Sequence, residues 1–178
     1  MRFILVVGSG ARELIIIKKL LEDTNKIDTK IEIICIKTQE NTCIEQFCYK
    51  TFDIKSSVYE TMLQIYEPID FSIIGPEAPL EKQYADYFEN VNIPCIGPIQ
   101  FYAQLETSKH FCRDFLHNNE ILKKFSPKFK TIHQKNKTRE SIKAIFDSFD
   151  EIVIKKDGLC GGKGVIVEGF DFSDKYEQ

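Results

Sequence analysis

The stretch EIVIKKDGLCGGKGVIV (Glu151–Val167) places two short β-branched runs on either side of a glycine-rich segment. The runs Ile152–Ile154 and Val165–Val167 have the composition of strands. Between the runs lie four glycines and three lysines: Gly158, Gly161, Gly162, Gly164, Lys155, Lys156 and Lys163. Glycine permits a positive φ and a close approach of backbone amides to an anion, and lysine adds positive charge. The pattern therefore predicts a strand–loop–strand flap that holds a polyphosphate.

Two other interpretations of this loop are less consistent with its sequence. A plain hairpin with a long mobile tip is disfavoured, because glycines and lysines dominate the segment. A P-loop needs Ser or Thr after Lys163, but Gly164 stands there. No obvious helix follows to offer its N-terminus to phosphate. The loop thus indicates a nucleotide-binding architecture other than the P-loop.

The composition disfavours several classes of function. The 178 residues are 43% hydrophobic, which suffices for one ordinary domain or two small ones. A net charge of -3 argues against a nucleic-acid partner, since such domains are normally basic. The six cysteines form no C-x-x-C pair and the three histidines share no metal-ligand spacing, so no metal site is predicted. Without a signal peptide or a run of transmembrane length, we expect a cytoplasmic protein with no membrane partner.

The N-terminus reads as strand, glycine turn and helix. Phe3–Val7 is a continuous apolar run, as in a strand buried on both faces. Apolar residues then recur at helical spacing from Leu14 to Leu21. The dinucleotide fingerprint G-x-G-x-x-G is incomplete, because Glu13 occupies its third glycine position. The turn is either an anion site at a helix N-terminus or a tight turn without a ligand.

Further strands and helices are expected to alternate along the chain. The expected strands are Ile31–Ile36, Asp70–Ile74, Pro94–Ile96 and Phe129–Ile132. The expected helices are a short one ending by Tyr49, one from Ser56 or Ser57 to about Tyr66, one that follows Leu80 and runs to about Asn90, and Ile99–Leu105, Thr107–Asn118 and Thr138–Phe149. This order indicates an α/β protein that begins with a Rossmann-like parallel sheet.

Ligands of such sheets bind beyond the carboxyl ends of the strands. We therefore expect the turns that follow the strands to lie together: Gly8–Glu13, Lys37–Asn41, Gly75–Leu80 and Gly97–Pro98. Glu77 stands between two prolines in one of these turns. It is either a binding residue or a carboxylate favoured by the dipole of the helix that it begins.

Five blocks of the sequence, in this order, resemble the phosphoribosylamine–glycine ligases, which are ATP-grasp ligases of purine synthesis. The blocks are VVGSGARE (Val6–Glu13), IIGPEAPL (Ile73–Leu80), IPCIGP (Ile93–Pro98), AQLETSKHFCRDF (Ala103–Phe115) and IVIKKDGLCGGKGVIV (Ile152–Val167). The resemblance implies a Rossmann-like substrate-binding domain over residues 1–102 and an incomplete ATP-grasp α+β subdomain over residues 103–178. It also implies a reaction that joins 5-phosphoribosylamine to glycine, while ATP becomes ADP and phosphate.

The resemblance also implies roles for individual residues. The sugar-phosphate substrate would be bound by Gly8, Gly10, Arg12, Glu13, Gly75, Pro76 and Glu77. ATP would be bound by Lys109, Lys155, Gly158, Gly161, Gly162, Lys163 and Gly164. Magnesium is expected in the family, but the acidic residues that hold it lie beyond the part that this chain matches. Catalysis of this kind depends mainly on positioning and on neutralising the transferred charge.

The sequence departs from the family at several positions. Leu14 replaces a histidine, and CIKTQENT (Cys35–Thr42) replaces a glycine-rich turn, both in the sugar-phosphate half. Because the family's metal and glycine sites have no counterpart, we expect the chain alone to have little or no ligase activity. We also expect apolar surface that favours self-association or a partner chain. The alternatives are a non-enzymatic relic that binds a phosphorylated ligand or a partner, and another ATP-grasp ligase such as a carboxylase subunit.

Overall fold

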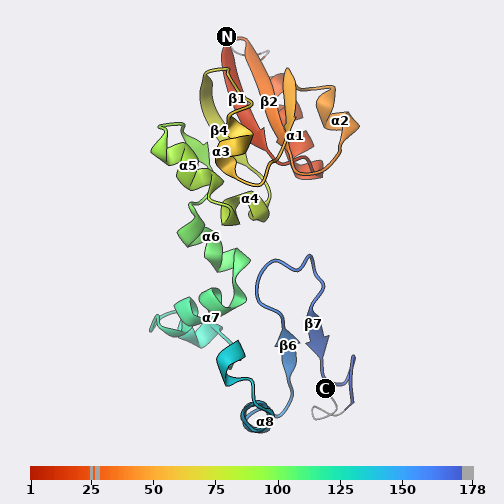
Figure 1. Cartoon of the computed structure of the whole chain (residues 1–178), viewed down its shortest axis with the longest axis vertical. Coiled ribbons are helices and arrows are strands. Elements are labelled where there is room, and N and C mark those ends of the chain that lie inside the picture. Colours follow the sequence, from red (N-terminus) through yellow and green to blue (C-terminus); the bar gives the residue numbers. More distant parts are fainter. Residues whose placement is uncertain (25, 27–28, 174–178) are drawn as a thin grey trace. The chain divides into compact units, whose positions relative to one another are not determined.

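The computed structural model describes residues 1–24, 26 and 29–173. The chain divides into two compact units, Met1–Gln104 and Leu105–Gln178, and each is described by itself. Figure 1 labels most of their helices and strands. In the part of the chain that the structure describes, no helix is both long enough and apolar enough to span a membrane.

The first unit is built on a five-stranded parallel sheet with the strand order β3-β2-β1-β4-β5. The strands are β1 (Arg2–Val7), β2 (Ile31–Lys37), β3 (Lys50–Asp53), β4 (Ile69–Ile74) and β5 (Cys95–Ile96). Central strand β1 is buried on both faces, so its side chains alternate between two apolar clusters. Leu5 belongs to one cluster and Ile4 to the other. This confirms the expected Rossmann-like sheet.

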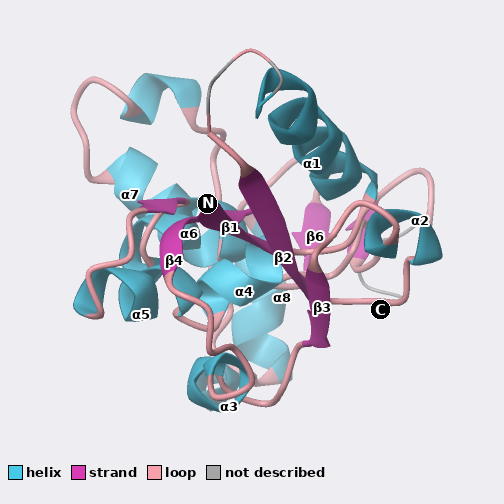
Figure 2. Ribbon diagram, turned by 90° about the horizontal axis from the view of Figure 1, so that it is seen from above, coloured by secondary structure: helices cyan, strands magenta, loops and turns pink. Residues whose placement is uncertain are grey.

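Helices cover both faces of this sheet (Figure 2). They are α1 (Ala11–Thr24), α2 (Thr42–Glu45), α3 (Val58–Met62), α4 (Glu77–Glu81) and α5 (Tyr84–Asn90). The next helix, α6 (Gln100–Thr107), begins in the first unit and runs past its limit at Gln104. Ile17 of α1 and Ile44 of α2 pack in the cluster of Ile4. Tyr84 and Phe88 of α5 pack in the cluster of Leu5. The fold is therefore a layered α/β arrangement with an apolar core on each side of the sheet.

Three sequence-based assignments in the first unit were wrong in detail. Edge strand β3 was not predicted, because Lys50–Asp53 carries one aromatic residue among polar ones. The helix expected to reach Tyr66 ends at Met62. The helix expected after Leu80 begins only at Tyr84, as α5, and a separate helix, α4, occupies most of the segment Gly75–Leu80 that was expected to be a turn. The division between α4 and α5 lies at Gln83, whose φ of 63° is left-handed and incompatible with a continuous helix.

Between residues 108 and 173, the described part of the second unit combines two α-helices, two short 3-10 helices and a β-hairpin. Its elements are α7 (Lys109–His117), η1 (Lys123–Phe125), η2 (Gln134–Asn136), α8 (Arg139–Asp147), β6 (Val153–Lys155) and β7 (Val165–Val167). Strands β6 and β7 are antiparallel, as the strand–loop–strand pattern predicts. The hairpin packs Ile154 and Ile166 against Phe146 of α8. The strand expected at Phe129–Ile132 is wrong: these residues form a loop, since a strand also needs a neighbour to pair with.

Candidate functional site

The first candidate site lies where β1 and β4 end. These strands are neighbours in the sheet, but β1 continues into α1 on one face and β4 into α4 on the other. Such a reversal at the carboxyl edge is the usual ligand-binding position of an open α/β sheet. All seven residues predicted to bind the sugar phosphate lie in the two turns here or in the first turn of the helix that follows each of them. We call them the β1–β4 turn cluster: Gly8, Gly10, Arg12, Glu13, Gly75, Pro76 and Glu77.

Glu13 occupies the interior of this cluster. It is only 2% exposed, and its Oε2 accepts a hydrogen bond of 2.6 Å from the amide of Gly10. Its Oε1 is buried and accepts no hydrogen bond from any described residue. A Cβ atom at Gly75 would lie 2.0 Å from that oxygen, so the Glu13 side chain explains why residue 75 has none. Gly8 is likewise needed because a Cβ there would lie 2.5 Å from Cδ of Pro76.

Arg12 carries the positive charge of the cluster at its surface. Its guanidinium Nη1 lies 3.5 Å from Oε1 of Glu77, and its Nε lies 3.9 Å from Oε1 of Glu13. The Arg12 side chain is 65% exposed, so its remaining donors face solvent. Glu77 also begins α4, where the helix dipole favours a carboxylate. The cluster therefore presents an arginine fork between two carboxylates, of which Glu13 is buried and Glu77 is partly exposed.

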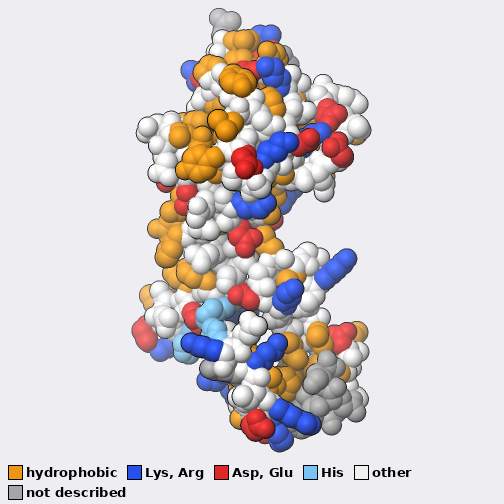
Figure 3. Space-filling model, viewed as in Figure 1, with side chains coloured by type: hydrophobic (Ala, Val, Ile, Leu, Met, Phe, Trp, Pro, Cys, Tyr) orange, Lys and Arg blue, Asp and Glu red, His pale blue; other side chains and the backbone are white. Residues whose placement is uncertain are grey.

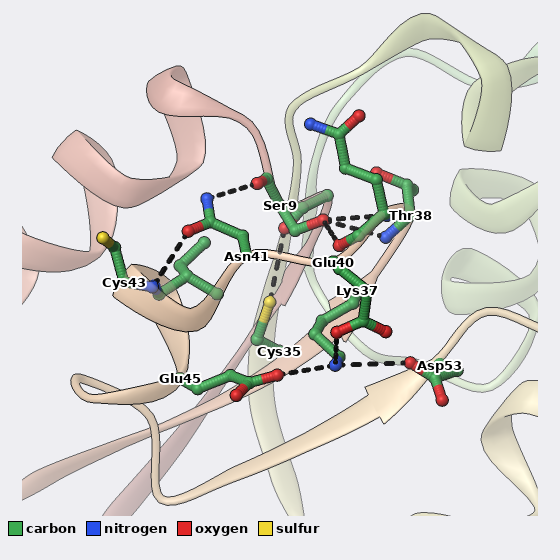
Figure 4. A network of polar contacts seen from close by, with 12 residues as sticks. Ser9, Cys35, Lys37, Thr38, Glu40, Asn41, Cys43, Glu45 and Asp53 are labelled. Carbon is green, nitrogen blue, oxygen red and sulfur yellow. Dashed lines mark hydrogen bonds and ion pairs between the residues drawn. The ribbon is translucent and has the colours of Figure 1, made fainter.

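Sequence analysis missed a polar network beside this cluster, which joins the end of β1 to the turn after β2 (Figure 4). Ser9 is fully buried, and its hydroxyl accepts hydrogen bonds from the amides of Thr38 and Gln39. Lys37 places its Nζ 2.6 Å from Oε1 of Glu45 and 3.1 Å from Oε2 of Glu40. These two carboxylates, Glu45 first, hold the pKa of the Lys37 ammonium well above its ordinary value. The available signal was a run of polar residues directly after two buried strands.

The second candidate site is the glycine loop, Gly158–Gly164, between β6 and β7. Its four glycines all have left-handed φ values, namely Gly158 (84°), Gly161 (56°), Gly162 (76°) and Gly164 (94°). A side chain would be strained at each of these positions. A Cβ at Gly158, Gly161 or Gly162 would meet no atom within 4 Å, so open space surrounds the loop backbone. The loop backbone is thus open at these three glycines, whereas a Cβ at Gly164 would lie 3.2 Å from Cβ of Lys156.

One end of the glycine loop is fixed to the start of α7. The Asp157 carboxylate accepts hydrogen bonds from the amides of Lys109 (2.7 Å) and His110 (3.2 Å). The Lys109 ammonium donates to the carbonyl of Gly158 over 2.8 Å. Partial burial alone would raise the pKa of Asp157, but the surrounding amides, His110 first, hold that pKa below its ordinary value. Sequence analysis missed Asp157, although it is an acidic residue next to a predicted phosphate loop.

The lysines predicted to bind ATP lie at different places around the loop. Lys109 touches the first loop glycine, as described above. Lys155 ends β6 opposite Val165, and its side chain is exposed. Lys163 is exposed within the loop, and its amide donates to the carbonyl of Cys160. The second unit therefore places three lysines around one open loop: Lys155 at its base, Lys163 within it and Lys109 where it is fixed to α7.

All three histidines line one cavity of about 700 Å³ in the second unit, which their sequence spacing did not indicate. The pale-blue side chains gather on the face shown in Figure 3. The rings of His110 and His133 lie edge to face with centroids 5.3 Å apart. Among residues 1–24, 26 and 29–173, no group of three His, Cys, Asp or Glu side chains could hold a metal ion.

Solved structures of similar fold place these features in a class. The synthetase for N5-carboxyaminoimidazole ribonucleotide from Thermotoga maritima aligns with a TM-score of 0.62 at 17% identity, covering 94% of this chain and 41% of that one. The biotin carboxylase domain of 2-oxoglutarate carboxylase from Hydrogenobacter thermophilus aligns at 0.60 and 15% identity, covering 93% and 37%. The hairpin with the open glycine loop lies within residues 107–176, which match an ATP-grasp domain model, so the chain carries part of an ATP-grasp fold.

The chain belongs to the phosphoribosylglycinamide synthetase family. The family's N domain matches residues 2–106, and its ATP-grasp (A) domain matches residues 107–176. A phosphoribosylamine–glycine ligase from Methanobrevibacter smithii is 31% identical over 98% of this chain and 37% of its own length. One from Pseudomonas putida is 34% identical over 92% and 36%, respectively. A bifunctional purine biosynthetic protein from Dictyostelium discoideum is 32% identical over 92% of this chain and 19% of its own length. The chain thus spans less than two fifths of these relatives.

Proposed function

We propose that this chain carries the sugar-phosphate-binding and nucleotide-phosphate-binding parts of a phosphoribosylamine–glycine ligase. Membership of the family supports the reaction: ATP, glycine and 5-phosphoribosylamine give glycinamide ribonucleotide, ADP and phosphate. The two candidate sites support a separate binding site for each phosphorylated substrate, because each site carries groups suited to 5-phosphoribosylamine or to ATP. The domain limits proposed for these parts are residues 1–102 and 103–178.

The β1–β4 turn cluster is proposed to bind 5-phosphoribosylamine. Arg12 offers a planar set of donors suited to a phosphate or to sugar oxygens. Glu77 is exposed enough to accept hydrogen bonds from sugar hydroxyls, and the buried Oε1 of Glu13 lacks a donor among the described residues. Gly8, Gly10 and Gly75 keep side chains out of the space around these groups, and the ring of Pro76 lies next to Gly8. The cluster would thereby hold the sugar and orient its amine.

The glycine loop is proposed to cover the phosphates of ATP. Backbone amides of Gly158, Gly161, Gly162 and Gly164 would approach the phosphate oxygens, while Lys109, Lys155 and Lys163 balance their charge. Bound ATP supplies the phosphoryl group that activates the glycine carboxylate. The described residues offer no acidic cluster for magnesium, so no role of this chain toward the metal is proposed.

The observation that carries this proposal is the open backbone of the glycine loop. We would titrate ATP calorimetrically into the wild-type chain, Gly162→Ala and Gly169→Ala. Both glycines have left-handed φ values and open surroundings, but Gly169 lies outside the loop, so it is a matched control. Holding alanine in that conformation costs about 1 kcal/mol or more, so Gly162→Ala should weaken ATP binding about fivefold or more. Equal affinities of all three proteins would contradict the proposal.

A second candidate function is binding of a phosphorylated small molecule without ligation. It is favoured by the turn after β2, where the Lys37 ammonium is paired with Glu40 and Glu45 and the amides of Thr38 and Gln39 bind the Ser9 hydroxyl. Titration of ribose 5-phosphate separates the two functions from each other. Binding of the sugar phosphate by a folded chain that binds no ATP would support the second function over the first.

A further inference from the structure

We infer that Ser9, Lys37 and Asn41 are positioning residues that hold the Gly8–Gly10 turn in its binding conformation without touching the ligand. We call these three residues the β2 clasp. The inference rests on the proposed function, because it assumes that the Gly8–Gly10 turn contacts a sugar phosphate. All contacts that carry it lie within the first unit, and Figure 4 shows them.

The Ser9 hydroxyl uses its full hydrogen-bonding capacity on the turn after β2. It donates to the carbonyl of Gln39 over 2.6 Å. It accepts from the amides of Thr38 over 3.1 Å and Gln39 over 3.0 Å. A hydroxyl has one donor and two acceptor positions, so no capacity is left for a ligand. Ser9 is fully buried and lies between Gly8 and Gly10 of the proposed site, so these hydrogen bonds fix the Gly8–Gly10 turn to the turn after β2.

Asn41 and Cys35 hold the carbonyl groups of the same turn. The Asn41 side-chain amide donates to the carbonyl of Ser9 over 2.7 Å. Its Oδ1 accepts from the amides of Cys43 and Ile44 and so caps α2. The Cys35 thiol donates to the carbonyl of Gly8 over 3.3 Å. The carbonyl groups of Gly8 and Ser9 therefore accept hydrogen bonds from side chains of β2 and of the turn that follows it.

Lys37 lies at the carboxyl end of β2, where a lysine could serve as a phosphate ligand. Its ammonium is instead surrounded by the carboxylates of Glu45 (2.6 Å), Glu40 (3.1 Å) and Asp53 (3.5 Å). Three partners match the three donors of an ammonium group, and the Lys37 side chain is 10% exposed. Lys37 thus ties the turn after β2 to α2 and β3, and it is not available to bind a phosphate.

These contacts form a chain of support from Lys37 through the turn after β2 to Gly8–Gly10. A site held in its binding geometry by neighbouring side chains loses less conformational freedom when the ligand binds. Loss of one clasp contact should therefore lower the affinity for the sugar phosphate and leave the affinity for ATP, which is proposed to bind in the second unit, unchanged.

The decisive substitution is Asn41→Asp. Aspartate keeps the oxygen that caps α2 but lacks the N–H that binds the Ser9 carbonyl. Asn41→Ser is a second variant that keeps a cap with a shorter side chain, should the first fail to fold. Thr42→Ala is the matched control, since Thr42 is the exposed first residue of α2 and lies outside the clasp.

Ribose 5-phosphate and ATP are titrated calorimetrically into each protein. The expected result is roughly tenfold weaker ribose 5-phosphate binding in Asn41→Asp, with unchanged ATP affinity and an unchanged Thr42→Ala control. Wild-type-like affinity in a folded Asn41 variant, or an equal loss of both affinities, overturns the inference alone. A wild-type chain that does not bind ribose 5-phosphate overturns the inference and the sugar-phosphate part of the proposed function together.

Discussion

Glu13 links two turns that are more than sixty residues apart in the sequence. Its buried side chain satisfies the amide of Gly10 and fills the space beside Gly75. The sequence motifs indicated Gly10, Glu13 and Gly75, but they gave no reason why residue 75 is a glycine. The structure supplies the reason, because the Glu13 side chain occupies the space that a side chain at residue 75 would need.

This relation predicts a non-additive pair of substitutions. Gly75→Ala should lower the free energy of unfolding by about 1–3 kcal/mol, because its Cβ overlaps the Glu13 side chain. In a Glu13→Ala background the same substitution should cost at least about 1 kcal/mol less, since the three atoms nearest to that Cβ all belong to Glu13. Urea unfolding of the four proteins measures the coupling. Strictly additive effects would contradict this packing.

Asp157 predicts a dependence on pH. Its pKa in the folded chain is held below the ordinary value of 3.8. A carboxyl group with a lowered folded pKa stabilises the fold fully above its unfolded pKa, and it loses this effect as the pH falls through the folded value. The difference in melting temperature between wild type and Asp157→Asn should be largest at neutral pH and should shrink below about pH 4. A difference that grows in acid would show that the anchor does not work as described.

The residues missed by sequence analysis have one physical feature in common. Ser9 bonds to amides about 30 positions away, and Asp157 bonds to an amide 48 positions away. Local patterns contain no information on such contacts, because the fold alone brings the partners together. The glycines of both sites were predictable, since each carries a conformational or steric requirement that marks the sequence itself.

At the scale of elements, hydrophobic pattern predicted the strands with strong apolar runs. The run in β1 indicated burial on both faces, and the β-branched runs indicated the β6–β7 hairpin. The pattern missed edge strand β3 and suggested a strand at Phe129–Ile132 that does not form. Edge pairing depends on a neighbouring strand more than on the composition of the segment itself.

Phe146 predicts how the hairpin is held. It is 9% exposed and packs with Ile152 and Phe172 beneath the hairpin. Phe146→Ala should destabilise the second unit by about 3 kcal/mol. Hydrogen exchange should rise in peptides of β6, β7 and α8. Phe170→Ala is the control, because Phe170 is 93% exposed and its loss should change stability by less than about 0.5 kcal/mol. Equal effects of the two substitutions would contradict the packing.

At the scale of the whole molecule, the chain matches two consecutive domains of one family but less than two fifths of the relatives' length. The family and the general fold were predictable from five motif blocks in a fixed order. The binding roles of individual residues stay predictions, as does the expectation that the chain alone makes little or no glycinamide ribonucleotide. They concern ligands, which neither the fold nor the family profile contains.

The most direct test is hydrogen exchange of the wild-type chain with ATP and with ribose 5-phosphate added separately. We predict that ATP protects peptides over the glycine loop, Gly158–Gly164. Ribose 5-phosphate should protect peptides over Gly8–Glu13 and Gly75–Glu77. Protection at neither site by saturating ligand, or protection of the glycine loop by ribose 5-phosphate alone, would contradict the assignment of the two phosphate-binding parts.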